Sequence, residues 1–311
     1  SNTRLIAESA FYKCKSLTSI TIPENVKVIE SLAFYDCASL FKVFWKAKNC
    51  NVRSGTNASG KAFTFGDSPI DSFVFGEEVE RIPSYLCYGL SKLTTITIPK
   101  NVVSIGLWVF AKCHMLDSVV WNATKCADFS TATGPFYDIR SHITSFKFGD
   151  NVQSIPDCLC YEMDKLQSIS IPNNVTTIGN SAFSGCSSLS SIALGNDVAT
   201  IGNYAFNNCS SLSSVALGNN VRTIGDYTFQ NCSSLPSITI PENVTDIGNY
   251  TFRDCSSLIT VVWNAKNCEI VATGSPYAST TPFYNIRSQI ASFKFGDNVQ
   301  TIPDYLCYGM D

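Results

Sequence analysis

Cysteine is the residue type with the greatest potential for chemistry in this sequence of 311 residues. There are 14 cysteines, a number that in a small secreted protein would indicate a disulfide framework. Side chains that recur in one phase of a repeat point in the same direction rather than at each other, which is poor disulfide geometry. Seven cysteines share such a phase beside apolar residues: Cys14, Cys37, Cys113, Cys186, Cys209, Cys232 and Cys255. We predict that they form a row of buried, reduced thiols that pack as small apolar groups.

The remaining cysteines do not form a pattern typical of a metal or redox site. Cys158 and Cys160 make a C-x-C pair, whereas redox motifs use C-x-x-C. Three others share a second phase but lie at least three repeats apart, so they cannot pair with one another: Cys50, Cys126 and Cys268. Because buried thiols avoid oxidation in any compartment, the cysteine content does not decide whether the protein works inside or outside the cell.

Other residues that commonly perform catalysis are few or scattered. His114 and His142 are the only histidines, and they lie at different phases of different repeats, without a metal-ligand spacing such as H-E-x-x-H. The sequence contains no G-x-S-x-G, P-loop or dinucleotide fingerprint. The carboxylates are spread over expected turns and form no recurring pair suited to acid–base work. The sequence therefore predicts no enzyme, no cofactor and no metal site.

The composition excludes two further classes of function. The net charge is −3 and only 15% of residues are charged, so no basic surface for nucleic acid is expected. No uncharged apolar run reaches the length of about 18 residues that a membrane-spanning helix needs, so no membrane insertion is expected.

An internal repeat organises the chain. Four consecutive segments align without gaps, and their cysteines, from Cys186 to Cys255, fall 23 residues apart. The unit reads I-G-x-x-A-F-x-x-C-x-x-L-x-x-I-x-I-P-x-x-V-x-x. A unit this short cannot bury its own apolar positions, so successive units must stack on one another. The alternation Leu189-x-x-Ile192-x-Leu194 predicts a short strand, and the 3-to-4 spacing of Ala-Phe-x-x-Cys predicts a helical turn.

The pattern predicts a single array over residues 1–311 with about twelve parallel strands. Three longer repeats carry extra residues at 51–62, 127–135 and 269–282. Both ends of the sequence fall inside a repeat, so we expect an array that is truncated at each end. The strands are expected at 17–22, 40–45, 70–75, 93–98, 116–121, 143–148, 166–171, 189–194, 212–217, 235–240, 258–263 and 290–295.

About a dozen copies in register from Thr3 onward resemble the leucine-rich-repeat class. More narrowly, the chain resembles the BspA-like family, whose mark is I-P-x-x-V-x-x-I-G-x-x-A-F-x-x-C-x-x-L. The resemblance implies an α/β fold: a right-handed solenoid with one long parallel sheet, and short helical turns and loops on the convex side. It also implies a surface protein of a host-associated microbe, extracellular or on the cell surface, and often an adhesin for matrix proteins such as fibronectin or fibrinogen. The long repeats, which begin W-K-A or W-N-A, depart from that pattern.

Recognition residues are expected on the outward face of the strands and in the long-repeat loops. Alternation places mostly Ser, Thr and Ala on that face, which are poor binding anchors, and a simply solvated face is the plain interpretation. The exceptions lie in the long repeats, and two of the loops contribute an aromatic side chain. The candidate ligand-binding residues are Lys42, Phe44, Lys147 and Lys294 on the strands, with Phe129 and Tyr277 in the loops.

The sequence thus favours a non-enzymatic interaction or adhesion module on a microbial cell surface. Its expected partner is a protein or glycan ligand, such as a host matrix component. The alternative is a structural spacer that displays another domain of a larger surface protein. Because exposed terminal repeats can pair end to end, we expect a monomer or weak end-to-end association.

Overall fold

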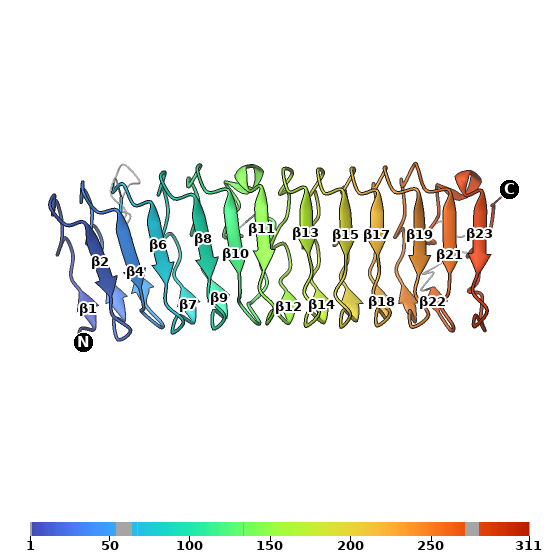
Figure 1. The fold of residues 1–311 in the computed structure, drawn as a ribbon, viewed down its shortest axis with the longest axis horizontal. Coiled ribbons are helices and arrows are strands. Elements are labelled where there is room, and N and C mark those ends of the chain that lie inside the picture. The colour runs from blue at the N-terminus through green and yellow to red at the C-terminus, as the bar shows by residue number, and fades with distance from the viewer. Residues whose placement is uncertain (1, 54–63, 67, 133, 271–279, 311) are drawn as a thin grey trace. The chain divides into compact units, whose positions relative to one another are not determined.

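The computed structural model describes residues 2–53, 64–66, 68–132, 134–270 and 280–310. Two compact units make up the chain, residues 1–149 and 150–311. In each unit the backbone winds into successive coils, one per repeat, and each ordinary coil contributes one longer and one very short strand (Figure 1). We call these the long strands and the short strands.

In the first unit both kinds of strand pair in parallel with their equivalents in neighbouring coils (Figure 1). The long strands hydrogen-bond as two groups of three, β2-β4-β6 and β8-β10-β11, and the short strands as β1-β3-β5 and β7-β9. The long strands are β2 (Ser19–Ile22), β4 (Lys42–Trp45), β6 (Ser72–Phe75), β8 (Thr95–Ile98), β10 (Ser118–Trp121) and β11 (Ser145–Phe148). The short strands are β1 (Leu5–Ile6), β3 (Val28–Ile29), β5 (Asn51–Val52), β7 (Arg81–Ile82) and β9 (Ser104–Ile105).

The second unit repeats this plan. Its long strands pair as β13-β15-β17 and β19-β21-β23, and its six short strands form one parallel ladder from β12 to β22. The long strands are β13 (Ser168–Ser170), β15 (Ser191–Ala193), β17 (Ser214–Ala216), β19 (Ser237–Ile240), β21 (Thr260–Trp263) and β23 (Ser292–Phe295). The short strands are β12 (Ser154–Ile155), β14 (Thr177–Ile178), β16 (Thr200–Ile201), β18 (Thr223–Ile224), β20 (Asp246–Ile247) and β22 (Glu269–Ile270).

A long strand lies within each of the twelve segments that the repeat predicts. Two features differ from the expected single sheet. The long strands are hydrogen-bonded in groups of three, and the short strands form additional ladders. The short strands were not predicted because a two-residue strand, such as Thr200–Ile201, is too short to show an alternating pattern in the sequence.

The prediction of a helical turn at Ala-Phe-x-x-Cys, and with it the α part of the α/β class, is wrong. Tyr204 and Asn208 have φ angles of 58° and 59°, in the left-handed region, which a right-handed helix cannot contain. The segment instead makes successive turns in which local and inter-coil hydrogen bonds alternate. The N–H of Phe206 donates to the carbonyl of Thr228 in the next coil (2.9 Å), while the N–H of Asn207 donates locally to the carbonyl of Tyr204 (3.1 Å). The helices among the described residues are two 3₁₀ turns, Arg140–His142 and Arg287–Gln289.

Residues one repeat apart stack directly on each other in the core. In the second unit the rings of Phe183 and Phe206 lie 5.4 Å apart with their planes within 2°, and Phe229 stacks on Phe206 at 5.5 Å. In the first unit Phe34 stacks in the same way on Phe11 at 4.9 Å. All these rings except Phe11 are fully buried. The repeat phase in the sequence is therefore a contact between neighbours in space, which is how units too short to fold alone bury their apolar side chains.

The Ile-Gly step and the polar residue after it hold neighbouring coils close together. The Oδ1 atom of Asn203 accepts the N–H of Asp226 in the next coil at 2.7 Å, and Asp226 Oδ1 accepts the N–H of Asn249 at 2.6 Å. A Cβ atom on Gly225 would lie 2.6 Å from the backbone nitrogen of Asn203, so only glycine permits this approach. No helix in the described part of the chain is long and apolar enough to cross a membrane.

Candidate interaction surfaces

The outward face of the long strands is made mostly of small side chains, as the alternation predicts. Its members are exposed, while the residues between them on each strand point into the core. They include Ser19, Thr21, Thr95, Thr97, Ser168, Ser170, Ser191, Ala193, Ser214, Ala216, Ser237 and Thr239. Hydroxyl and methyl groups of this size offer hydrogen bonds and little contact area, so most of the face lacks anchoring groups.

Lys42, Phe44 and Val74 form the clearest exception, and we call these three residues the β4–β6 patch. The Nζ atom of Lys42 lies 4.7 Å from the centre of the Phe44 ring, within the range of a cation–π contact. Phe44 is directly opposite Val74 in the parallel pairing of β4 with β6, and Val74 is 43% exposed. The patch therefore joins a positive charge to an exposed apolar surface that adjacent coils build together.

The two other lysines among the predicted residues lie in similar settings. Lys147 in β11 is exposed and opposite the half-buried Val120 of β10. Lys294 in β23 is exposed and opposite the half-buried Val262 of β21. Lys147 belongs to the same unit as the β4–β6 patch, but three long strands lie between β4 and β11, and Lys294 belongs to the other unit. Within the first unit the structure thus gives two separate small patches, one around Lys42 and one around Lys147.

Phe129 and Tyr277, the two predicted loop aromatics, have different outcomes. Phe129 is half-buried, and its ring packs edge-on against the buried indole of Trp121, with centroids 6.2 Å apart. Much of its surface therefore serves packing within its own coil. Tyr277 lies outside the described residues.

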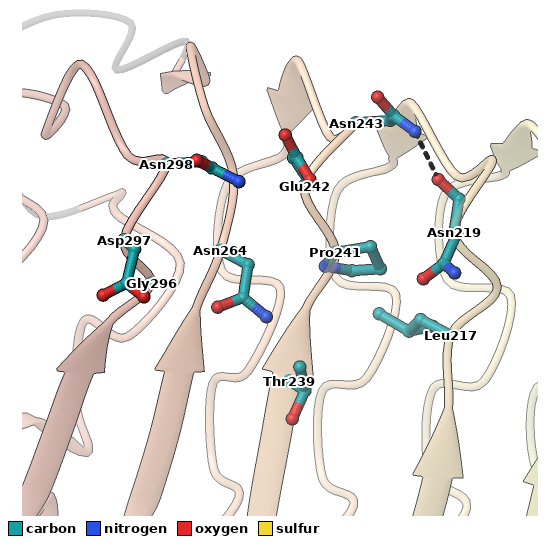
Figure 2. Close-up of a pocket in the computed structure, with 10 residues that line it drawn as sticks. All are labelled: Leu217, Asn219, Thr239, Pro241, Glu242, Asn243, Asn264, Gly296, Asp297 and Asn298. Carbon is teal, nitrogen blue, oxygen red and sulfur yellow. Dashed lines mark hydrogen bonds between the residues drawn. The ribbon is translucent and has the colours of Figure 1, made fainter.

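A polar groove that sequence reasoning missed lies in the second unit, beyond the carboxyl ends of the long strands from β17 to β23 (Figure 2). Its volume is about 440 Å³. The amide nitrogen of Asn243 donates a 2.8 Å hydrogen bond to the carbonyl of Asn219, which fixes one wall of the groove. The lining residues are Leu217, Asn219, Thr239, Pro241, Glu242, Asn243, Asn264, Gly296, Asp297 and Asn298.

The chemistry of this groove is that of hydrogen bonding to a polar ligand. Amides and two carboxylates, Glu242 and Asp297, dominate its lining, and no aromatic ring is among the lining residues. Glu242 also forms an ion pair with Lys266, with 3.2 Å between Oε1 and Nζ. The signal in the sequence was the recurrence of Asn, Asp and Glu in the turns that follow the strands. Sequence reasoning assigned these residues to turns and did not foresee that several turns converge.

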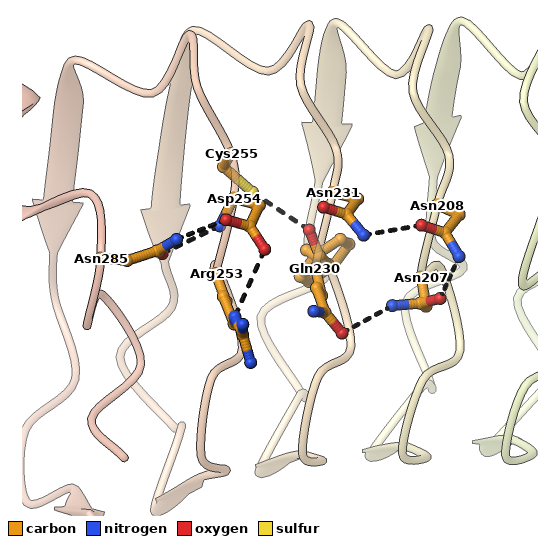
Figure 3. A network of polar contacts seen from close by, with 9 residues as sticks. Asn207, Asn208, Gln230, Asn231, Arg253, Asp254, Cys255 and Asn285 are labelled. Carbon is orange, nitrogen blue, oxygen red and sulfur yellow. Dashed lines mark hydrogen bonds and ion pairs between the residues drawn. The ribbon is translucent and has the colours of Figure 1, made fainter. Parts of the chain in front are cut away.

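The polar side chains of the turns before the long strands are occupied with one another (Figure 3). Asn231 Nδ2 donates to Asn208 Oδ1 at 2.7 Å, Asn208 Nδ2 to Asn207 Oδ1 at 2.6 Å, and Asn207 Nδ2 to Gln230 Oε1 at 3.0 Å. In a separate group, Asp254 forms an ion pair with Arg253 of its own coil at 3.3 Å and accepts a hydrogen bond from the side-chain amide of Asn285 in the next coil. These groups satisfy each other across neighbouring coils, so the network stabilises the stack.

The cysteines are free, as predicted. Of the seven that share the first phase, Cys14 is half-exposed rather than buried, and the other six donate thiol hydrogen bonds to the preceding coil. The Sγ atom of Cys186 lies 3.3 Å from the carbonyl oxygen of Cys160 in the preceding coil, and Cys113 Sγ lies 3.0 Å from that of Cys87. Burial raises the pKa of the Cys113 and Cys186 thiols to about 12, although backbone hydrogen bonds oppose the shift. Thiols of that kind are poor nucleophiles and poor metal ligands. The described residues hold no group of three or more His, Cys, Asp or Glu side chains that could bind a metal ion.

Parallel strands, stacked coils and an inward Leu-x-x-Ile pattern define a leucine-rich-repeat solenoid with almost no helix among the described residues. The model of the BspA type leucine rich repeat region matches residues 1–117, 56–186, 130–259 and 188–310. These matches cover nearly the whole chain, and the protein belongs to this family.

Several solved structures are similar to this chain. A leucine-rich repeat protein from Bacteroides ovatus is 21% identical, with a TM-score of 0.47, and the match covers 94% of this chain and 88% of that one. A leucine rich cell surface protein from Faecalibacterium prausnitzii is 20% identical, with a TM-score of 0.41 and coverages of 94% and 83%. The pneumococcal vaccine antigen PcpA is 15% identical, with a TM-score of 0.38 and coverages of 96% and 85%. No curated protein matches the chain.

Proposed function

We propose that this protein is a non-enzymatic recognition module at the surface of a microbial cell, which binds a protein or glycan ligand such as a host matrix component. Membership of the BspA type family supports an interaction role. The observation that carries the proposal is the contact of Lys42 with the Phe44 ring, next to the exposed Val74. Phenylalanine is among the residues enriched at the centre of protein interfaces, and the cation beside the ring adds electrostatic complementarity to an acidic group of a ligand.

The rigidity of the scaffold adds to this proposal. The backbone beneath the β4–β6 patch is held by strand pairing, so no ordering of the backbone is needed when a ligand binds, and only the side chains lose freedom. Lys147 beside Val120, and Lys294 beside Val262, would supply further contacts of the same chemistry to an extended ligand. The polar groove of the second unit, with its amides and carboxylates, suits the hydroxyl groups of a glycan.

The chain itself supplies the variant that tests the strand face. In β2 the outward pair is Ser19 and Thr21, which lie directly opposite Lys42 and Phe44. The double substitution Lys42→Ser and Phe44→Thr therefore copies an outward pair that this fold already accepts. Binding of wild type and variant to immobilised matrix proteins and glycans would be compared, with Ser19→Ala/Thr21→Ala as the matched control.

We expect at least one ligand of the panel to bind wild type and the control about equally. The double variant should bind that ligand about 30-fold more weakly, which corresponds to the roughly 2 kcal/mol typical of a hot spot. Unchanged binding by the double variant would remove the β4–β6 patch from the interface. Failure of wild type to bind any member of the panel would argue against recognition and favour the role of a structural spacer.

A further inference from the structure

The only two histidines of the chain are in contact with each other in the first unit. His114 is exposed and lies in the turn before β10, whereas His142 is half-buried and ends the 3₁₀ turn Arg140–His142. The centres of their imidazole rings are 5.2 Å apart and the ring planes are inclined by 46°. The two residues occupy different phases of the repeat, but the longer repeat between them brings their rings into contact.

The second unit contains the same arrangement of coils without histidine. Cys255-Ser256-Ser257-Leu258 matches Cys113-His114-Met115-Leu116, and Arg287-Ser288-Gln289-Ile290 matches Arg140-Ser141-His142-Ile143. Both histidines are therefore departures from the matched copy, and both occur at the one place where they meet. This pairing of substitutions points to a property that the two imidazoles have together.

His142 also differs from its counterpart in how its polar atoms are satisfied. The side-chain nitrogen of Gln289 donates to the backbone carbonyls of Cys255 at 2.6 Å and Leu258 at 3.2 Å, so its place in the fold is that of a structural cap. The Nδ1 atom of His142 is buried and has no hydrogen-bond partner. A buried polar atom without a partner costs about 1–3 kcal/mol, so His142 does not take over the structural role that Gln289 has in the second unit.

We propose that His114 and His142 form a two-histidine site for a borderline divalent cation, with Zn²⁺ as the representative ion. A histidine nitrogen binds zinc at about 2.0–2.1 Å, which places the ring centre roughly 3.2 Å from the ion. At the tetrahedral angle that zinc adopts, two such rings have centres about 5 Å apart. The observed separation of 5.2 Å therefore fits two ligands of one ion.

The donor set decides which cations the site takes. Imidazole suits Zn²⁺, Cu²⁺ and Ni²⁺, whereas Ca²⁺ and Mg²⁺ require oxygen ligands. The described residues offer no third His, Cys, Asp or Glu side chain to complete a cluster. Water would occupy the remaining positions, so we expect one ion per chain and weaker binding than in a closed structural zinc site.

Nuclear magnetic resonance of protein labelled with ¹⁵N only in histidine gives a direct test, because the spectrum contains just two imidazoles. The protein must carry no histidine tag, and Zn²⁺ is titrated alone. We expect both imidazoles to respond along one saturable curve with one equivalent of zinc, and neither to respond to Ca²⁺. Movement of one imidazole alone, or of neither, would overturn the proposal.

The matched copy supplies the variants, His114→Ser and His142→Gln, which copy Ser256 and Gln289. Each single variant removes one ligand of a chelate, so zinc should bind the remaining histidine at least tenfold more weakly, since loss of an outer-shell partner alone costs about 10–100-fold. The 14 cysteines stay in place in both variants and serve as the internal control for thiol binding. Unchanged zinc affinity at the remaining histidine in either variant would show independent binding and contradict the shared site.

Discussion

The Sγ atom of Cys209 lies 3.3 Å from the backbone carbonyl oxygen of Phe183, a residue of the preceding coil. The same bond recurs one coil further on, where Cys232 Sγ donates to the carbonyl of Phe206 at 3.3 Å. The sequence predicted that these thiols act only as small apolar groups. The structure shows that they also satisfy backbone carbonyls of buried turns, which explains why a residue that is both small and a donor recurs in this phase.

Substitution of Cys209 should separate these two contributions. Cys209→Ala removes the thiol volume and the donor, and we expect it to lower the free energy of unfolding by about 1–3 kcal/mol. Cys209→Ser keeps a donor at the same place and should cost less. Urea unfolding followed by circular dichroism gives both values. Equal losses for the two variants would mean that the hydrogen bond to Phe183 contributes nothing.

Burial of the thiols predicts a wide difference in their reactivity. Cys14, Cys158 and Cys307 are half-exposed, whereas the other eleven of the 14 cysteines are buried. A thiol reagent at neutral pH should label the half-exposed residues first and the buried ones only as the protein opens. After denaturation without reductant, all 14 should react. Mass spectrometry of the labelled peptides identifies each residue, and any disulfide found would contradict the free-thiol structure.

Alkaline pH should destabilise the stack through the same residues. Burial raises the folded-state pKa of Cys113, Cys186 and Cys255 from 9.0 to about 12. Between these values the unfolded chain holds fewer protons, so this stability is complete below pH 9 and is lost as the pH rises toward 12. Each thiol contributes at most about 1.4 kcal/mol per pH unit in that range.

The measurement is the free energy of unfolding of wild type and Cys186→Ala from pH 8 to pH 10.5, a range chosen around the unfolded thiol pKa of 9.0. Other alkaline groups titrate equally in both proteins. The variant should therefore show a smaller decline with pH than wild type. Parallel declines would show that the Cys186 thiol is not the source of the effect.

Close packing of the coils predicts that replacing Gly225 lowers the stability of the protein. A Cβ atom there would lie 2.6 Å from Asn203 N and 2.8 Å from the carbonyl carbon of Gly202, both of which belong to the backbone. Gly225→Ala should cost about 1–3 kcal/mol of stability, as overpacking does. Gly134→Ala is the matched control, because the nearest atom to its Cβ would be 3.7 Å away. If thermal unfolding shows equal effects for the two variants, the coils are not as close as described.

The parts of this fold that depend on a local residue pattern could be predicted from the sequence. The spacing of Leu189, Ile192 and Leu194 predicts a strand with one buried face. The recurrence of Phe and Cys identifies the rows of side chains that stack in the core. The same alternation correctly placed Lys42 on the outward face and left Phe44 beside it. What recurs every 23 residues can be interpreted without knowledge of the three-dimensional structure.

Features that depend on contacts between neighbouring coils could not be predicted from the sequence. Nothing in the type of Tyr204 signals a left-handed backbone, since that conformation is imposed by hydrogen bonds to the next coil. The contact of His114 with His142 depends on how the residues of a longer coil are aligned with those of its neighbour. Phe129 packs on Trp121, a contact that its place in an inserted loop does not reveal.

Contact in space between residues one repeat apart is the physical claim on which the scaffold and its exposed face both depend. Nuclear Overhauser effects between phenylalanine rings, in deuterated protein with only Phe protonated, test it most directly. Phe206 should show cross-peaks to both Phe183 and Phe229, whose ring centres lie 5.4 and 5.5 Å away, with none between Phe183 and Phe229. Assignment follows from the loss of those peaks in Phe206→Leu. Absence of the two neighbour cross-peaks in a folded sample would contradict the stacked-coil structure.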